Sequence, residues 1–345
     1  MADAELILPT IDDVRTAAGR IDGIAIETPL LESSSLNRML GGRLLVKAEN
    51  LQVTGSFKLR GAANRVAALT DDERRRGVIA RSSGNHGLAI AYCAQLMGTT
   101  AIVVAPDTAP TTKIARIKAY GALVVQVPME RLSEVARDLA VREDRVFVPP
   151  ADDFHVVAGA GTVGIEIADQ AARLGLAPDI VLASCSGGGL TAGCLLGLSD
   201  LSPATSVFAV EAVGFEKMGR SLAAGRRIDL EAPGHSICDA ITGHYMAAVP
   251  FEIIRPRLAG TLAVTDDEVR EAMRGAFGEF GLAWSRAVPW RWRRSWRGAC
   301  RSLEGPSSRS SPVVTSTWPW RPMRLAGSYD GVPRRLRFMT KESGP

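Results

Sequence analysis

Short apolar, β-branched runs alternate with longer stretches of helical periodicity over the first 282 of the 345 residues. The runs that predict strands are 44–47, 77–80, 101–104, 123–127, 180–183 and 206–210. The stretches that predict helices are 58–69, 88–97, 111–120, 132–143, 162–174 and 190–198. Thr265 and Glu268 have the spacing of a capping box and predict a further helix to about Phe280. This alternation is typical of βαβ units and predicts an α/β fold with parallel sheets covered by helices.

The composition is that of a soluble globular protein, with 46% hydrophobic and 23% charged residues. No apolar run reaches the ~18 residues that a membrane span needs, so we expect no membrane partner. The five cysteines include no CxxC pair, which argues against a disulfide framework or a zinc site. The first five residues carry acidic groups and no basic segment, so we expect no signal peptide and a cytoplasmic location.

The charge and the tryptophans are distributed unevenly along the chain. Residues 283–345 hold 13 Lys and Arg against 3 Asp and Glu, although the net charge of the whole chain is only +4. All six tryptophans also lie in this tail. The composition therefore changes abruptly near residue 283.

The first candidate for chemistry is Lys58, in the segment S-F-K-L-R-G-A of residues 56–62. A lysine near the start of a helix is usually a solvated surface residue. The positive end of the helix dipole disfavours a cation there, and the same field lowers the pKa of an amine. A lowered pKa suits a nucleophilic lysine.

Two loops that join a predicted strand to a predicted helix are candidates for binding anions. One is S-S-G-N-H-G at 82–87, whose backbone N–H groups would lie at the positive end of the following helix. An ordinary loop capped by Ser or Asn is the alternative interpretation. The other is S-C-S-G-G-G-L at 184–190, where three glycines permit a backbone nest around a phosphate. It matches neither the nucleotide P-loop nor the G-x-G-x-x-G pattern.

In combination, these three motifs resemble the fold type II pyridoxal-phosphate enzymes, and in particular the threonine/serine ammonia-lyases (dehydratases) and serine racemases. The resemblance covers about residues 10–282. It also takes in the segments K-A-E-N-L-Q at 47–52, G-A-G-T at 159–162, V-E at 210–211 and S-I-C-D at 236–239. It implies a two-domain fold like that of the tryptophan synthase β chain, with the cofactor in the cleft between domains. We expect a large domain formed by 1–76 and 149–282, and a small inserted domain at 77–148.

The resemblance also implies a role for each matching residue. Lys58 would form the Schiff base with pyridoxal 5'-phosphate, Phe57 would lie beside the ring, and Asn85 would bind the ring hydroxyl. The phosphate would be held by the backbone of Ser186, Gly187, Gly188, Gly189 and Leu190. The pocket for the substrate carboxylate would be formed by Ser82, Ser83, Asn85 and His86.

The chemistry implied is elimination of water from L-threonine, L-serine or a similar hydroxy amino acid. Lys58 would take the Cα proton, the β-hydroxyl would leave, and hydrolysis would give a 2-oxo acid and ammonia. Ser83 keeps a racemase or hydroxyaspartate ammonia-lyase open, because in racemases of this family a serine here faces the lysine across the substrate. Elimination is the first choice because it needs only Lys58. Relatives are usually dimers or tetramers, so we expect a homo-oligomer.

Some positions depart from the family's pattern. Ala160 replaces a common glutamine, and Ala240 replaces a common glycine. Some relatives bind a divalent cation through the equivalent of Glu211 and an acid six residues later. Here the later position is Lys217, whose ammonium is no metal ligand, so we expect no metal. The alternative for Glu211 is a carboxylate at a strand end, paired with Lys217.

The tail 283–345 lacks the V-V-E-x-x-G-A-like segment, the helix and the S-G-G-N strand end that the family has there. A basic arm for nucleic acid and a disordered tail are two interpretations. A third is translation out of frame after a one-base shift near Leu282. Shifted codons re-read 283–301 as VVEGGAVALAAVLAGRLP and 310–322 as SGGNVDVALAA, matches that persist through the single codon of each Trp. On this third interpretation we expect no nucleic-acid partner. If the protein does end in residues 283–345 as given, we expect it to bind the cofactor weakly.

Overall fold

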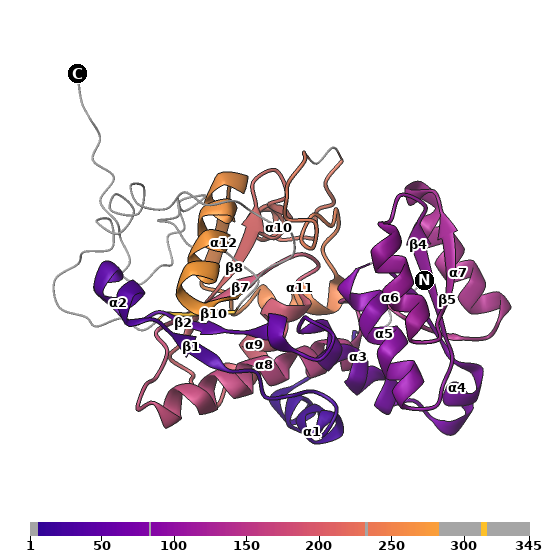
Figure 1. Ribbon diagram of the computed structural model, residues 1–345, viewed down its shortest axis with the longest axis horizontal. Coiled ribbons are helices and arrows are strands. Elements are labelled where there is room, and N and C mark those ends of the chain that lie inside the picture. The colour runs from indigo at the N-terminus through magenta and orange to yellow at the C-terminus, as the bar shows by residue number, and fades with distance from the viewer. Residues whose placement is uncertain (1–5, 83, 232–233, 283–311, 316–345) are drawn as a thin grey trace.

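The computed structural model describes residues 6–82, 84–231 and 234–282, and the backbone of 312–315. Two α/β bodies lie side by side, each built on its own sheet (Figure 1). The larger sheet has the strand order β1-β2-β10-β7-β8-β9 and the smaller has the order β5-β4-β3-β6. All pairings are parallel except that of β1 with β2. The predicted α/β class with parallel sheets is therefore confirmed.

The strands of the larger sheet are β1 (Leu30–Glu32), β2 (Leu45–Lys47), β7 (Ile180–Ser184), β8 (Ser206–Ala212), β9 (Gly260–Val264) and β10 (Pro312–Thr315). Its helices are α1 (Ile11–Ile21), α2 (Ser34–Leu40), α3 (Lys58–Ala67), α8 (Phe154–Arg173), α9 (Gly189–Leu198), α10 (Lys217–Ala224), α11 (Ala248–Ile254) and α12 (Asp266–Phe280), with the 3-10 turn η1 (Glu49–Leu51). The smaller body contains α4 (Asp71–Arg76), β3 (Val78–Arg81), α5 (Asn85–Leu96), β4 (Ala101–Pro106), α6 (Thr111–Ala119), β5 (Leu123–Val127), η2 (Met129–Arg131), α7 (Leu132–Arg142) and β6 (Val146–Val148).

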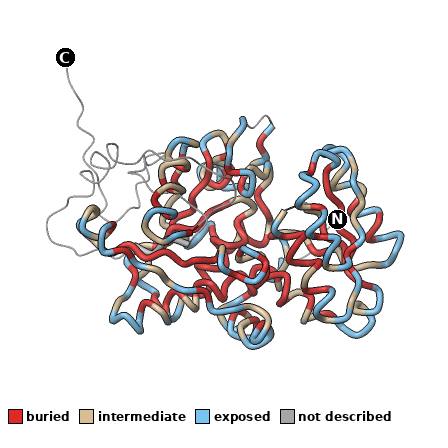
Figure 2. The backbone as a smooth tube through the Cα atoms, in the orientation of Figure 1, coloured by how far each residue is buried: buried red, intermediate tan, exposed pale blue. Residues whose placement is uncertain are grey.

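Each face of the larger sheet buries its own hydrophobic core, because successive strand residues point to opposite faces. Val181 and Ala183 of β7 pack in one core with α8 and α9. Leu182, between them, packs in the other with Leu36 of α2 and Val269 of α12. Strands β2, β7 and β8 are buried over almost their whole length, and Figure 2 shows such buried segments as red tube between exposed loops. This two-sided burial explains why these strands are almost continuously apolar.

Helices α3, α8 and α9 approach one another backbone to backbone at glycines. A Cβ on Gly159 of α8 would lie 2.5 Å from the carbonyl oxygen of Arg60 in α3. A Cβ on Gly197 of α9 would lie 2.3 Å from the carbonyl oxygen of Gly161. The absence of a side chain at these positions therefore sets how closely α3, the helix that begins with Lys58, lies on the larger body.

The tail contributes one strand to the larger sheet. The backbone of Pro312–Thr315 pairs in parallel with both β2 and β7, in the middle of the larger sheet. Without it, two core strands would face each other with unpaired backbone groups, which is costly in an interior. The β-branched pair Val313-Val314 suits a strand. The rest of 283–345 lies outside the described residues, so the frameshift remains a prediction.

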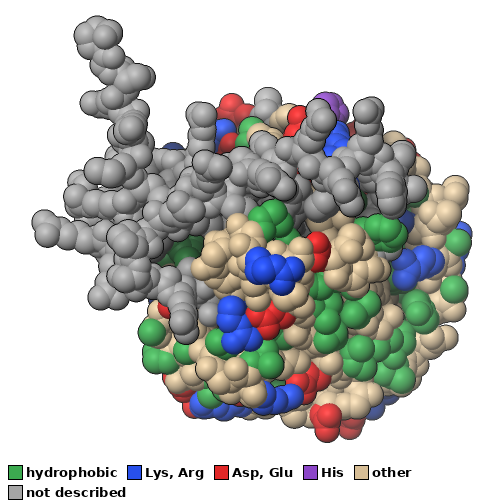
Figure 3. Space-filling view, turned by 60° about the vertical axis from the view of Figure 1, so that its left-hand side comes forward, with side chains coloured by type: hydrophobic (Ala, Val, Ile, Leu, Met, Phe, Trp, Pro, Cys, Tyr) green, Lys and Arg blue, Asp and Glu red, His purple; other side chains and the backbone are tan. Residues whose placement is uncertain are grey.

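The surface of the described residues carries both signs of charge. On the face drawn in Figure 3, Lys and Arg side chains lie close to Asp and Glu. No helix among the described residues is long and apolar enough to cross a membrane.

Candidate functional site

Lys58 is the first residue of α3, where the chain enters the helix without a side-chain cap. Its half-buried Nζ donates a hydrogen bond to the carbonyl oxygen of Pro150 at 2.6 Å and lies 5.0 Å from the ring centroid of Phe57. Burial lowers the pKa of Lys58 to about 8. Since a neutral amine is the nucleophilic form, this environment makes Lys58 far more reactive near neutral pH than an ordinary surface lysine.

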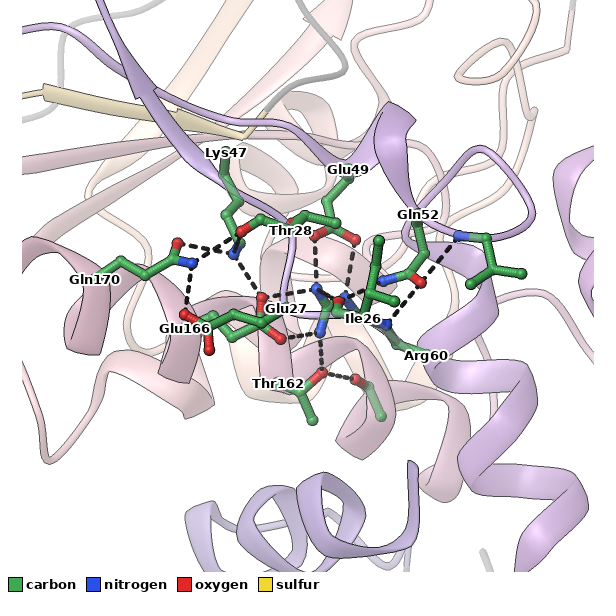
Figure 4. A network of polar contacts seen from close by, with 12 residues as sticks. Ile26, Glu27, Thr28, Lys47, Glu49, Gln52, Arg60, Thr162, Glu166 and Gln170 are labelled. Carbon is green, nitrogen blue, oxygen red and sulfur yellow. Dashed lines mark hydrogen bonds and ion pairs between the residues drawn. The ribbon is translucent and has the colours of Figure 1, made fainter. Parts of the chain in front are cut away.

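The first turn of α3 is fixed by a buried network of charged groups around Arg60 (Figure 4). The Arg60 guanidinium donates to both carboxylate oxygens of Glu49, at 2.8 and 2.9 Å, and to both oxygens of Glu166. Burial alone would lower the pKa of Arg60, but the two carboxylates outweigh it and hold it above its usual value. Lys47 Nζ completes the network by donating to Glu166 at 2.5 Å and to Gln170 at 2.9 Å.

This network links α3 to β2, to η1 and to α8. It therefore fixes the position of the helix that begins with Lys58. Its members at 47, 49 and 60 belong to the motifs K-A-E-N-L-Q and S-F-K-L-R-G-A. These three residues have no role among those that the family resemblance implies. The signal that could have found them is charge: Lys47 directly follows the apolar run 44–46, Glu49 comes two residues later, and Arg60 stands between Leu59 and Gly61.

The turn that precedes α5 is fixed by a hydrogen bond inside it and by close packing against α5. Ser82 Oγ accepts a hydrogen bond from the N–H of Gly84 at 3.1 Å, and a Cβ on Gly87 would lie only 2.1 Å from the carbonyl oxygen of Ser82. Asn85 opens α5 and is exposed. The turn thus presents the N-terminus of α5, with its positive dipole end, to an incoming anion.

His86 supports this turn from the inside. Its ring is buried, and Nε2 lies 2.9 Å from the carbonyl oxygen of Val148. A carbonyl oxygen can only accept, so Nε2 carries the proton of the neutral ring. Burial, reinforced by the charge of Lys58, lowers the pKa of His86 to about 3 and keeps the ring neutral. Its predicted substrate contact, and that of Ser82, remain predictions, and Ser83 lies outside the described residues.

The glycine loop joins β7 to α9. Gly188 is the N-cap of α9 and has φ +91°, which a residue with a side chain rarely adopts. Gly187 and Gly189 face Ala151, to whose Cβ an added Cβ would come within 3.1 and 3.3 Å. Backbone N–H groups at the start of a helix are a ready anion site. Ser186 is half-buried beside this turn, and Leu190 is buried behind it.

Lys58 and the glycine loop both contact the segment 150–151. The Lys58 amine contacts the carbonyl oxygen of Pro150, and the next residue, Ala151, lies against Gly187 and Gly189. This segment cannot be found from the sequence, because a backbone carbonyl acceptor has no residue signature. The structure thus brings together a reactive amine and a backbone cradle that lie about 130 positions apart in the chain.

Glu211 has a structural role at the end of β8. Its two carboxylate oxygens accept hydrogen bonds from the N–H groups of Met218 and Gly219, at 2.8 and 3.1 Å, at the start of α10. Burial raises the pKa of Glu211 to about 7. Lys217 Nζ donates to the carbonyl oxygen of Ile241 at 3.4 Å, and no ion pair joins it to Glu211 in the part of the chain that the structure describes. Within those residues no cluster of His, Cys, Asp and Glu could hold a metal ion.

Comparison with known proteins gives a consistent result. Residues 21–284 match the family model described as pyridoxal-phosphate dependent enzyme. The chain is 36% identical over 270 residues to L-threo-3-hydroxyaspartate ammonia-lyase of Saccharomyces cerevisiae, covering 78% of this chain and 81% of that protein. It is 34% identical over 281 residues to serine racemase of Dictyostelium discoideum, covering 80% and 83%. The crystal structure of a T.th. threonine deaminase superposes with a TM-score of 0.77 at 37% identity, covering 89% and 97%.

Pyridoxal 5'-phosphate is the cofactor of this family, and the residues present fit it. The cofactor needs an amine for its aldehyde and donors for its phosphate. Lys58 offers a half-buried amine of lowered pKa. The loop at 186–189 offers backbone N–H groups at the start of α9, in a conformation that needs glycine at 188, where φ is +91° and a Cβ would lie 2.3 Å from the buried Met246 Cε. The Lys58 amine contacts Pro150, and the glycine loop contacts the next residue, Ala151.

Proposed function

Because the chain belongs to the pyridoxal-phosphate dependent enzymes, we propose that it is an ammonia-lyase that converts a hydroxy amino acid, such as L-threonine or L-serine, into a 2-oxo acid and ammonia. The relatives that support this proposal are an ammonia-lyase, a threonine deaminase and a serine racemase. The observation that carries it is the half-buried amine of Lys58, of lowered pKa, beside the glycine loop.

In this proposal Lys58 both holds the cofactor and moves the Cα proton of the substrate. When bound, the cofactor supplies an electron sink for the Cα carbanion. A base that works near neutral pH needs a pKa close to that pH. The pKa of about 8 meets this requirement, because burial disfavours the charged ammonium.

The other residues bind and orient. The backbone of Ser186–Leu190 and the N-terminus of α9 would hold the phosphate, with Phe57 beside the ring and Asn85 on its hydroxyl. The turn at 82–86 would hold the substrate carboxylate at the N-terminus of α5. The Cα–H and Cβ–O bonds break, the hydroxyl leaves with a proton as water, and hydrolysis of the enamine takes up that water and releases ammonia.

Racemisation is the second candidate, and Ser83 is the residue on which it depends. A hydroxyl on the face opposite Lys58 could return a proton to Cα and so invert it. The similarity to a serine racemase favours keeping this alternative. The two reactions are told apart by their products, since racemisation releases no ammonia.

The test is to incubate the cofactor-loaded protein with each hydroxy amino acid and to follow 2-oxo acid, ammonia and enantiomer together. Lys58→Ala should abolish all products and the visible absorbance of the lysine–cofactor linkage. Lys118→Ala, at an exposed position of α6, is the matched control and should change neither. Turnover by Lys58→Ala at the wild-type rate would refute the proposal.

A further inference from the structure

Arg81 adds a positive charge next to the site, in addition to Lys58 and the positive dipole end of α5. It is the last residue of β3, is half-buried, and directly precedes the turn that begins at Ser82. The carboxyl ends of parallel strands are where α/β folds bind their ligands. We propose that Arg81 binds a second carboxylate on the substrate, so that the preferred substrate is a dicarboxylic hydroxy amino acid such as 3-hydroxyaspartate. This inference rests on the proposed function, whose substrate it narrows.

Neutral groups hold the Arg81 side chain. Its guanidinium donates to Ser133 Oγ at the start of α7 and to the Tyr245 hydroxyl, and it lies 5.3 Å from the centroid of the Tyr245 ring. In the described part of the chain no carboxylate forms an ion pair with Arg81, in contrast to Arg60, which has two. Two neutral acceptors and an aromatic ring fix its direction but leave its positive charge uncompensated. That charge is therefore available to an anion from outside the protein.

The charge of Arg81 acts on the site itself. Burial is the main cause of the low pKa of His86, and the positive charges of Lys58 and Arg81 lower it further. Both cations are thus within electrostatic reach of the same imidazole, which lies under the turn at 82–86. Tyr245, which accepts from Arg81, lies in a segment that borders the glycine loop. The N–H of Ala247 donates to the carbonyl oxygen of Gly187 at 3.4 Å, and an added Cβ on Gly243 would lie 2.9 Å from Ser186 Oγ. A substrate bound at Lys58 would therefore have Arg81 beside its remaining substituent.

The other anions of the proposed reaction already have donors. The cofactor phosphate is assigned to the glycine loop, and the α-carboxylate to the N-terminus of α5. Arg81 is held jointly by Ser133 of the smaller body and by Tyr245, which precedes α11 of the larger one. A second carboxylate placed here would be bound where the two bodies meet, by a planar donor that suits carboxylate.

The reaction balances with this substrate. The Cα–H bond and the C3–O bond of 3-hydroxyaspartate break, and the hydroxyl leaves with a proton as water. Hydrolysis of the enamine takes up that water and releases ammonia, so the products are an oxo dicarboxylic acid and ammonia. No oxidant or reductant is consumed, and Arg81 takes no part in the bond changes.

The test compares L-aspartate with L-asparagine, in which a neutral amide of nearly the same shape replaces the second carboxylate. Binding of each to the cofactor-loaded protein is measured by calorimetry. We expect the wild type to prefer L-aspartate, and Arg81→Met to lose roughly 10- to 100-fold of that preference, the value of a hydrogen bond to a charged group. The ratio of kcat/KM for L-threo-3-hydroxyaspartate to that for L-serine should fall by a similar factor.

Control variants separate this role from damage to the fold. Arg137→Met, at an exposed position of α7, should leave both ratios unchanged. Tyr245→Phe, which removes one of the two holding hydroxyls, should give an intermediate loss. If Arg81→Met fails to fold, Arg81→Lys replaces it, and we expect a smaller fall because lysine keeps the charge but not the two-nitrogen fork that donates to both hydroxyls.

Two outcomes would overturn the inference: a wild type that does not prefer L-aspartate, or an Arg81 variant that keeps the preference. Equal losses for aspartate and asparagine would assign Arg81 to the α-carboxylate instead. Failure of the proposed function looks different, since no hydroxy amino acid would then release ammonia. The calorimetric comparison would still decide the role of Arg81.

Discussion

Replacing Arg60 by methionine should destabilise the protein strongly, although Arg60 is not assigned to bind the cofactor. The side chains of Arg60 and Glu49 are each 1% exposed, and that of Glu166 is 18% exposed. The variant leaves the buried Glu49 and the partly buried Glu166 without the guanidinium that lies between them, although Glu166 keeps its ion pair with Lys47. Removing one partner of a buried ion pair costs about 3–5 kcal/mol of the free energy of unfolding.

The assay is urea unfolding of Arg60→Met beside Arg270→Met. Arg270 pairs with Asp267 at 2.7 Å, but the two side chains are 41% and 93% exposed, so its loss should cost less than about 1 kcal/mol. Arg60→Lys should fall between them, because lysine keeps the charge but not the forked geometry. Cofactor affinity should fall only in the Arg60 variants, since Lys58 lies two residues before Arg60 on α3. A cost for Arg60→Met no larger than that for Arg270→Met would refute the idea that this network holds α3.

Three further predictions concern the helix contacts, the amine and the tail. Gly197→Ala should destabilise by roughly 1–3 kcal/mol in thermal or urea unfolding, because its Cβ would meet the backbone of Gly161 at 2.3 Å; an unchanged midpoint would contradict the close approach. The rate at which apo-protein captures pyridoxal phosphate should rise with pH and level off above about 8, because Lys58 reacts as the neutral amine; a rise that continues to pH 10 would show an ordinary lysine. Resequencing of the gene should find a one-base shift near codon 282, next to residue 284 where the family match ends; an intact frame through codon 345 would show that the tail is genuine.

Periodicity and turn chemistry in the sequence predicted much of the fold. The capping box of Thr265 and Glu268 is present at the start of α12, which ends at Phe280 as expected. The sequence pattern predicts a helix that starts at 162, but α8 begins at Phe154. Asp153 caps it, because its side chain accepts from the N–H of Val156. The glycines of α8 disfavour a helix intrinsically, and only the close contacts with α3 and α9 explain them. Such contacts are tertiary and leave no local pattern.

The site was predictable only where its residues are close in sequence. The turn at 82–87 and the glycine loop could each be found as a motif between a strand and a helix. The network around Arg60 joins Glu49 and Glu166, which are 11 and 106 positions away in the chain. The acceptor of the Lys58 amine is a backbone carbonyl at 150, which carries no residue signature. Arg81 could have been noticed, since a charged residue closes a buried strand directly before a motif.

The proposed site and the proposed reaction both depend on Lys58 as the residue that carries the cofactor. The most direct measurement is to load the full chain with pyridoxal phosphate, reduce the linkage with borohydride, and map the modified peptide by mass spectrometry. The modification should be on Lys58 alone, because its amine has a pKa lowered by burial and contacts Pro150, next to the residue that packs on the glycine loop. Labelling of a different lysine, or labelling spread over several surface lysines, would contradict the assignment of the site.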